Sequence, residues 1–161
     1  MVENSNKKSD EELLEESHIH KDDSLVILNT HTRINQALCG EILKLEVGYV
    51  EVRLTTTDEM VADDMGLIHG GFVFGAADFA AMAAVNEKNV VLVASDCQFL
   101  SPVKLYDEVN FVARVRHKEG RKRNVHVIGK VHDIKVFEGE FKTVITEKHV
   151  LKLKLYNEDE D

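Results

Sequence analysis

Residues 69–86 read HGGFVFGAADFAAMAAVN, and this stretch decides the fold. Its side chains are small or apolar on every side, and alanine, its commonest residue, is the best helix former. A helix that is apolar all round is a buried helix rather than an amphipathic surface helix. The 16 residues from Gly70 to Val85 are fewer than the roughly 20 needed to cross a bilayer. The stretch therefore predicts one long helix in the core of a soluble protein.

Asp78 is the one formal charge in this stretch. A carboxylate buried among alanines must be paired, hydrogen-bonded or protonated, because isolated burial of a charge is costly even after relaxation. Burial also raises its pKa towards the range that is useful for proton transfer near neutral pH. Asp78 is therefore our candidate for a general base or a nucleophile. The alternative is a structural acid that only hydrogen-bonds the backbone of a partner subunit.

The charges of the chain are concentrated at its two ends. The formal net charge is −9, of which residues 1–23 contribute −5 and residues 158–161 contribute −4. We therefore divide the chain into a flexible acidic arm (1–23), a single domain of zero net charge (24–157) and an acidic tail (158–161). This distribution of charge argues against nucleic acid as a partner.

Cysteine and histidine usage predicts neither a disulfide framework nor a metal site. The two cysteines, Cys39 and Cys97, are most simply buried or half-buried thiols. His18, His20 and His31 have no cysteine or carboxylate at a ligand spacing, so we predict no metal and no cofactor. The first residues lack the apolar core of a signal peptide, and we therefore expect a cytoplasmic protein that does not bind a membrane.

The rest of the chain predicts a short helix and an antiparallel sheet. We expect the helix within residues 30–38, ending before Gly40. Alternating or continuous apolar residues predict strands at 41–57 (bent or bulged at Gly48), 90–94, 109–116, 124–131 and 136–150. The only proline, Pro102, marks a corner after the second of these strands. The predicted fold class is therefore α+β, with one long helix covering the sheet.

The central helix also carries a family resemblance. His69-Gly70-Gly71, the acid Asp78 nine residues after the histidine and the alanine-rich helix resemble the signature of hotdog-fold acyl-CoA thioesterases, especially the phenylacetate-pathway type. Residues 95–103 (SDCQFLSPV) are similar to that family's second strand and the corner after it. The resemblance implies a hotdog fold, in which an antiparallel sheet wraps around one helix. It also implies a homodimer, or a dimer of dimers, whose sheets join.

The same resemblance implies roles for individual residues. Asp78 would be the general base, or the nucleophile, acting on the thioester of an acyl-CoA. The Gly70 N–H, at the positive end of the helix, would stabilise the thioester oxyanion, and His69 would hold the loop. Gly71 and Phe74, in the first turns of the helix, are assigned to substrate binding. The alternative for this segment is a plain helix start, in which the glycines serve only packing.

A basic turn predicts where the nucleotide end of coenzyme A binds. Residues 114–123 (RVRHKEGRKR) hold six cations and a single acid. Lys118, Arg121, Lys122 and Arg123 are our candidates for contacts with the phosphates, because Arg and Lys bind phosphate well. The alternative is a solvated hairpin turn, which is what most charge runs are.

A second resemblance points to a non-catalytic function. Residues 70–84, the strand around Phe99 and residues 136–141 are similar to the malonyl-CoA-sensing domain of the bacterial fatty-acid biosynthesis repressor. That domain binds an acyl-CoA without hydrolysing it, and its helix carries an amide where Asp78 stands. The acidic first 23 residues have no counterpart to the repressor's DNA-reading helices. We therefore predict an acyl-CoA-binding protein that hydrolyses its ligand, with a non-catalytic acyl-CoA sensor as the alternative.

Two positions depart from the thioesterase pattern. Asp63 stands six residues before the histidine, where the family often has a polar amide. The bulky Phe79 follows Asp78, where a small or polar residue is common. Both differences bear on which substrate is bound and turned over.

Overall fold

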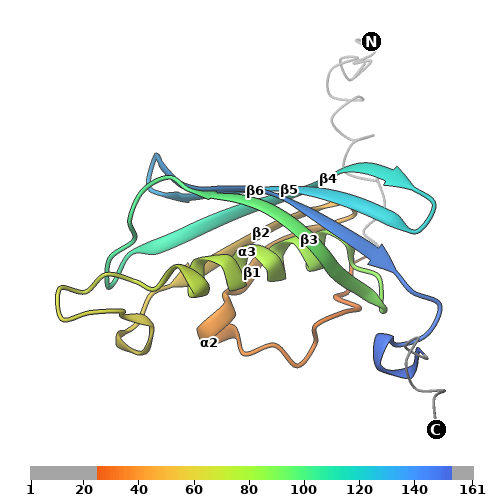
Figure 1. The fold of residues 1–161 in the computed structure, drawn as a ribbon, viewed down its shortest axis with the longest axis horizontal. Helices are drawn as coiled ribbons and strands as arrows, with labels where there is room; N and C mark the ends of the chain where they lie inside the picture. Colours follow the sequence, from red (N-terminus) through yellow and green to blue (C-terminus); the bar gives the residue numbers. More distant parts are fainter. Residues whose placement is uncertain (1–24, 154–161) are drawn as a thin grey trace, which may run out of the picture.

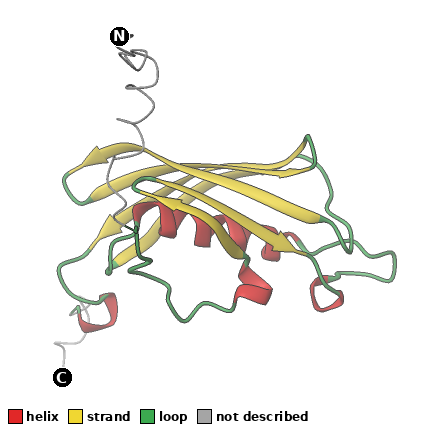
Figure 2. Cartoon of the chain, turned by 180° about the vertical axis from the view of Figure 1, so that it is seen from behind, coloured by secondary structure: helices red, strands yellow, loops and turns green. Residues whose placement is uncertain are grey.

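The computed structural model describes residues 25–153, and the predicted arm (1–23) and tail (158–161) lie outside them. Six antiparallel strands form one sheet in the order β1-β2-β4-β5-β6-β3. The strands are β1 (Glu41–Glu46), β2 (Tyr49–Thr55), β3 (Val90–Phe99), β4 (Glu108–Glu119), β5 (Lys122–Val131) and β6 (Ile134–Ile145). The helices are α2 (Gln36–Cys39), α3 (Gly70–Val85) and the 3-10 turns η1 (Asp58–Met60) and η2 (Val150–Lys152). The sheet curves over α3, which lies along its concave face (Figure 1 and Figure 2), so the predicted α+β class with a sheet wrapped around one helix is confirmed.

The long helix fits under the sheet because its side chains are small. Nine residues of α3 are buried, and six of these are alanines, as the apolar stretch predicted. Larger rings from the sheet fill the remaining space: Phe137 lies with its ring centroid 6.2 Å from those of both Phe111 and Phe141. No helix within residues 25–153 is long and apolar enough to span a membrane.

The prediction of one strand over residues 41–57 is wrong, because this segment is a hairpin of two strands. β1 and β2 are joined by a tight turn, and Glu46 pairs directly with Tyr49 across it. Gly48 has a φ of +75°, a left-handed conformation that glycine adopts without steric cost. A glycine between two alternating runs is compatible with a bulge as well as a turn, and alternation alone does not distinguish them.

The predicted short helix begins later than expected. α2 starts after Asn35, whose side chain accepts hydrogen bonds from the backbone N–H groups of Ala37 (3.0 Å) and Leu38 (3.3 Å). Asparagine is a favoured N-cap residue, so this cap fixes the helix start. The helix ends before Gly40, as predicted, and the residues before Asn35 form a loop.

β3 and β6 differ most from their predicted bounds, and β4 and β5 are longer than predicted by a few residues. β3 continues to Phe99 instead of ending at Ala94, and it pairs with β6 along this length. β6 ends at Ile145 rather than at Val150, where η2 begins. The polar residues in the second half of β3 hid its length, because only the first half is a continuous apolar run.

β3 forms one edge of the sheet, and its outer side has no strand partner among the described residues. The strand is 10 residues long, and its Val93 and Phe99 side chains are 59% and 55% exposed. A long edge strand with exposed apolar residues is a ready template for pairing with another strand. The edge of β3 is therefore an exposed strand surface with apolar side chains.

Candidate active site

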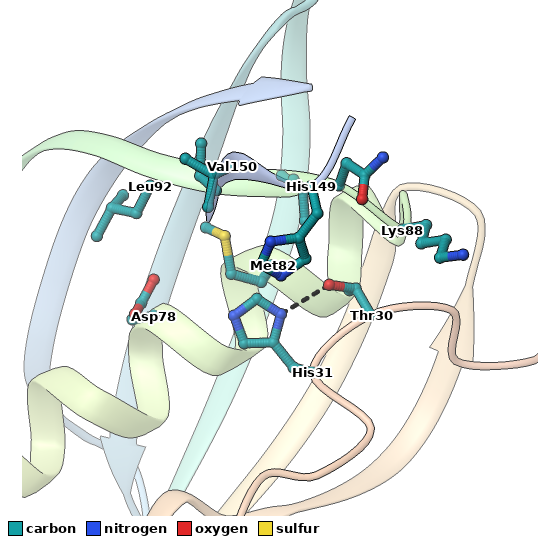
Figure 3. A pocket seen from close by; sticks show the side chains of 11 residues that line it. Thr30, His31, Asp78, Met82, Lys88, Leu92, His149 and Val150 are labelled. Carbon is teal, nitrogen blue, oxygen red and sulfur yellow. Dashed lines mark hydrogen bonds between the residues drawn. The ribbon is translucent and has the colours of Figure 1, made fainter. Parts of the chain in front are cut away.

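A cavity of about 390 Å³ lies beside Asp78. It is lined by α3, the loop before α2, the start of β3 and the segment around η2 (Figure 3). α3 contributes Asp78 and Met82, the loop contributes Thr30 and His31, and His149 comes from the C-terminal segment. Segments from both ends of the described chain therefore meet near this carboxylate.

Asp78 lies in surroundings that disfavour its charged form. Its Oδ1 atom is buried and has no hydrogen-bond partner among residues 25–153. Burial raises the pKa of Asp78 from 3.8 to about 6, because the carboxylate is poorly solvated there. The raised pKa expected from the apolar sequence is thus found. Because Asp78 also lines the cavity, its carboxylate can accept a hydrogen bond or a proton from a bound molecule.

The start of α3 is open to solvent and closely approached by one histidine. His69 and Gly71 are exposed, and the His69 backbone N–H donates to the Met60 carbonyl at 2.9 Å. The His69 imidazole lies over Gly71, with Nε2 only 2.8 Å from the place where a Cβ would stand. Gly70 lies against the ring of Phe99, whose Cε1 atom is 3.5 Å from the place where a Cβ on Gly70 would stand. Because the first N–H groups of a helix lack intrahelical partners, this end can receive an oxygen acceptor.

Asp78 and Gly70 cannot act on the same carbonyl group within one chain. They are eight residues apart in α3, and a rise of 1.5 Å per residue separates them by about 12 Å along the helix axis. The Asp78 cavity opens at the start of β3, whereas Gly70 lies beside Phe99 at the end of β3. A single chain therefore holds two separate parts of the predicted site.

Two other residues singled out from the sequence, Phe74 and Asp63, make contacts that stabilise the core and the loop before α3. Phe74 is half-buried, and its ring centroid lies 5.7 Å from that of Phe141 in the core. Asp63 accepts hydrogen bonds at Oδ1 from the backbone N–H groups of Met65 (3.0 Å) and Leu67 (3.1 Å). The Asp63 carboxylate thus organises the loop that leads into α3.

The basic turn joins β4 to β5 at the end of the molecule where α3 ends (Figure 1). Arg121 forms an ion pair with Glu147. Arg123 donates to two backbone carbonyl oxygens of its own turn, at 2.7 Å and 2.9 Å. Lys118 and Lys122 form no ion pair within residues 25–153. Two of the four predicted phosphate ligands therefore already have partners inside the chain, and the turn lies far from the start of α3.

A second cluster of basic side chains adjoins the Asp78 cavity. Lys88, Lys148, His149 and Lys152 line a neighbouring cavity of about 590 Å³, which shares Lys88 and His149 with the first. Among the described residues, none of the three lysines forms an ion pair. Sequence reasoning missed this cluster because its members come from two loops that are far apart in the chain.

The sequence also did not indicate that His31 lies in the Asp78 cavity. In residues 25–153, no group of three or more His, Cys, Asp or Glu side chains is arranged to hold a metal ion. His31 lines the Asp78 cavity, and burial lowers the pKa of its imidazole. Its neutral form is therefore favoured at neutral pH.

A more apolar cavity of about 560 Å³ lies away from Asp78, beside the loop before α3. Met65, Leu67 and Ile134 are among its lining residues. Its acid, Asp107, accepts a hydrogen bond from the backbone N–H of Lys104 at 3.0 Å. Because the Asp107 carboxylate already has a backbone partner, whereas Asp78 Oδ1 has none in the described chain, the chemistry is better placed at Asp78.

Comparisons of sequence place these features in a family. A family model described as "Thioesterase superfamily" matches residues 65–136. Methylthioribose-1-phosphate isomerase of Aquifex aeolicus is 51% identical over 117 residues, which are 73% of this chain and 26% of that protein. Transcription factor FapR of Thermoanaerobacter pseudethanolicus is 28% identical over 114 residues, 70% of this chain and 57% of that protein. The chain thus spans about a quarter of the first relative and little more than half of the second.

Solved structures agree with this assignment. An uncharacterized protein from Pyrococcus horikoshii has a TM-score of 0.77 and 43% identity, over 78% of this chain and 97% of that one. A hypothetical thioesterase from Streptococcus pneumoniae, described with coenzyme A, has a TM-score of 0.62 and covers 68% of this chain and 87% of that one. Its identity of 21% shows a shared fold only. With the matched family model, the sheet wrapped around α3 and these neighbours, the chain belongs to the hotdog-fold thioesterase superfamily.

Proposed function

We propose that two copies of this chain bind an acyl-CoA between them and hydrolyse its thioester. The observation that carries this proposal is the Asp78 carboxylate, whose buried Oδ1 has no partner in the described chain and whose pKa is raised to about 6. Membership of the thioesterase superfamily supports it, as does the coenzyme A named with the Streptococcus pneumoniae neighbour. The reaction uses water and the acyl-CoA, and it needs no further cofactor.

The proposed dimer forms through the free edge of β3. Two β3 strands that pair antiparallel about their midpoints place Val90 of one copy opposite Phe99 of the other. Phe99 contacts Gly70, and Val90 lines the Asp78 cavity. This pairing brings the start of one α3 towards the Asp78 cavity of the other copy. It therefore unites the two parts of the site that are about 12 Å apart along the helix in one chain.

In the proposed reaction Asp78 acts as the general base. Its carboxylate takes a proton from a water molecule as the water oxygen attacks the thioester carbonyl carbon. The negative charge that develops on the carbonyl oxygen is stabilised by the backbone N–H groups at Gly70 and Gly71 of the other copy. The carbon–sulfur bond then breaks, and its electron pair goes to sulfur. Protonated Asp78 returns its proton to the sulfur, which leaves as the free thiol of coenzyme A.

The pH profile of turnover is expected to report the pKa of Asp78. Only ionised Asp78 can accept the proton, so kcat/KM should fall about tenfold per pH unit below pH 6 and level off above it. The profile is measured between pH 4.5 and 8 on one hydrolysed acyl-CoA, with the fold checked by circular dichroism at each pH. A flat profile across this range would contradict a base with a pKa of about 6.

The lysine cluster beside the cavity is an alternative to the basic turn as the binding site for the coenzyme A phosphates. We expect Lys88→Glu combined with Lys152→Glu to weaken acyl-CoA binding roughly tenfold at low salt, and less at high salt, because exposed charges are screened. The measurement is isothermal titration calorimetry at two salt concentrations.

Arg121→Glu combined with Arg123→Glu provides the matched comparison, since it reverses the same number of charges on the basic turn. Both arginines already have partners within the chain, so we expect the smaller loss of affinity here. A loss of affinity confined to the arginine variant would assign the phosphates to the basic turn instead.

The alternative function is an acyl-CoA sensor that does not hydrolyse its ligand. The overlap with FapR, a transcription factor, favours this second candidate. A panel of acyl-CoAs of different chain lengths separates the two functions, with hydrolysis followed by release of the free thiol and binding measured in parallel. Hydrolysis of any member supports the enzyme, whereas tight binding without hydrolysis of any member supports the sensor.

A further inference from the structure

His31 has a backbone conformation that something else must maintain. Its φ is +52°, in the left-handed region that side-chain-bearing residues adopt infrequently. The loop that carries it is tied to the end of α3 by Asn86. The Asn86 side chain accepts from the Asn29 N–H at 2.7 Å and donates to the Ile27 carbonyl at 2.8 Å. These two hydrogen bonds hold the strained loop over the Asp78 cavity.

The imidazole of His31, like its backbone, is held in place by neighbouring residues. Its Nδ1 lies 2.7 Å from the hydroxyl oxygen of Thr30, a residue that is only 5% exposed. The ring also lies against Phe79, with 6.5 Å between the ring centroids. Both Thr30 and Phe79 therefore restrict the orientation of the ring.

The Thr30 contact determines which ring nitrogen faces Asp78. No other acceptor for the Thr30 hydroxyl occurs among the described residues, so its proton is best placed on the hydrogen bond to Nδ1. The neutral ring then carries its own proton on Nε2. Figure 3 shows this second nitrogen on the side of the ring that faces Asp78 across the cavity.

His31 and Asp78 line the same cavity, so a water there can lie between them. No direct hydrogen bond joins the two side chains among the described residues. A water in a polar cavity needs two or more hydrogen-bonding partners, and the Nε2–H donor together with the Asp78 carboxylate supplies them.

We propose that His31 is a positioning residue of the thioesterase site, where its Nε2–H donates a hydrogen bond to the water that Asp78 activates. This inference rests on the proposed hydrolysis. His31 does not transfer the proton itself, because a neutral imidazole that lost the Nε2 proton would become an unstable anion. Its task is to hold the water oxygen so that one O–H points at Asp78 and a lone pair points at the thioester carbon. Lys88 and His149 also line the cavity, but both are exposed, and the His149 Nδ1 accepts a hydrogen bond from the Leu151 backbone N–H at 3.1 Å on the surface segment around η2.

The first test removes the imidazole without disturbing the backbone. His31→Gly relieves the left-handed strain, so the fold should survive, yet kcat should fall about thirtyfold with KM within about threefold of wild type. His31→Gln, which restores an N–H donor, should recover part of this loss. Thr30→Val, which frees the ring but keeps the shape of residue 30, should lower kcat by less than His31→Gly. A His31→Gly variant that is folded and as active as wild type overturns the proposal.

His132 offers a matched control. It has the same φ of +52°, but it lies in the turn between β5 and β6 and is absent from the Asp78 cavity. His132→Gly relieves equal strain elsewhere and should leave kcat unchanged. An equal loss of kcat in both glycine variants would show a general effect on the fold and overturn the positioning role.

A second readout does not depend on turnover. Nitrogen-15 NMR of the His31 ring should show the neutral form protonated at Nε2 at pH 7.5. A ring protonated at Nδ1 overturns the proposal even if no acyl-CoA is hydrolysed. Failure of hydrolysis with the expected NMR result would instead refute only the proposed reaction, and the water bridge would stand.

Discussion

Replacing Asp78 with asparagine is expected to lower acyl-CoA hydrolysis by about a hundredfold or more. The amide keeps the shape of the carboxylate and its ability to accept a hydrogen bond, but it cannot take a proton from water. Binding should stay the same or become tighter, since an amide is desolvated more easily than a carboxylate. Rates are measured by single-turnover and steady-state release of coenzyme A, and affinity by calorimetry.

The stability of the same variant gives an independent check on Asp78. The pKa of Asp78 is raised to about 6 in the folded protein, so the native state binds the proton more tightly than the unfolded chain. The ionised carboxylate therefore destabilises the fold above pH 6, and the cost disappears as the pH falls towards 3.8. The shift corresponds to about 3 kcal/mol as an upper limit. Asp78→Asn should raise Tm at pH 7 and have little effect on it near pH 4.

Asp133→Asn serves as the control, because Asp133 is an exposed aspartate in the turn between β5 and β6. It should change neither the rate nor the pH dependence of Tm. Hydrolysis by Asp78→Asn at the wild-type rate would refute the proposed base. If instead Asp78 is a nucleophile, it forms a mixed anhydride with the acyl group. A single turnover in oxygen-18 water, followed by mass spectrometry of the protein, would then find the label in the Asp78 carboxyl group when water attacks the aspartyl carbon of that anhydride.

The central helix and its acid could be predicted because their signals are local. A run of alanines specifies a helix through intrinsic propensity, and its apolar character on every side specifies burial. One acid in that run is conspicuous whatever surrounds it in space. The same argument explains why the raised pKa of Asp78 could be expected before the cavity was known.

The contacts around Asp78 could not be predicted, because they depend on segments that are distant in the chain. His31 is one of several histidines in a polar region, and only its hydrogen bond to Thr30 and the Asn86 contacts set it apart. Arg121 is a second example, because its place in a basic run did not indicate that it forms an ion pair with Glu147. Tertiary hydrogen bonds and ion pairs leave no periodic pattern in a sequence.

Charging the middle of β3 is expected to abolish both the dimer and its turnover. In the proposed pairing Ala94 of one copy lies opposite Ser95 of the other, and both side chains are exposed in the single chain. Ala94→Lys combined with Ser95→Lys places like charges directly across the two strands, which destabilises the pair. Analytical ultracentrifugation should find a folded monomer. Hydrolysis should fall about a hundredfold or more, since Asp78 then lacks the Gly70 N–H of a second copy.

A charge-swapped variant tests the register as well as the dimer. Ala94→Lys combined with Ser95→Glu places a lysine opposite a glutamate at both symmetry-related positions, so dimer and turnover should return together. Leu43→Lys, on the opposite edge strand β1, charges an edge without touching β3 and should leave both unchanged. A monomer that hydrolyses at the wild-type rate would show that one chain holds a complete site. A dimer that persists with two lysines would place the contact elsewhere. If dimer and turnover return only in the charge-swapped variant, the two β3 strands pair about Ala94 and Ser95. That pairing brings the Asp78 of one copy to the start of α3 in the other.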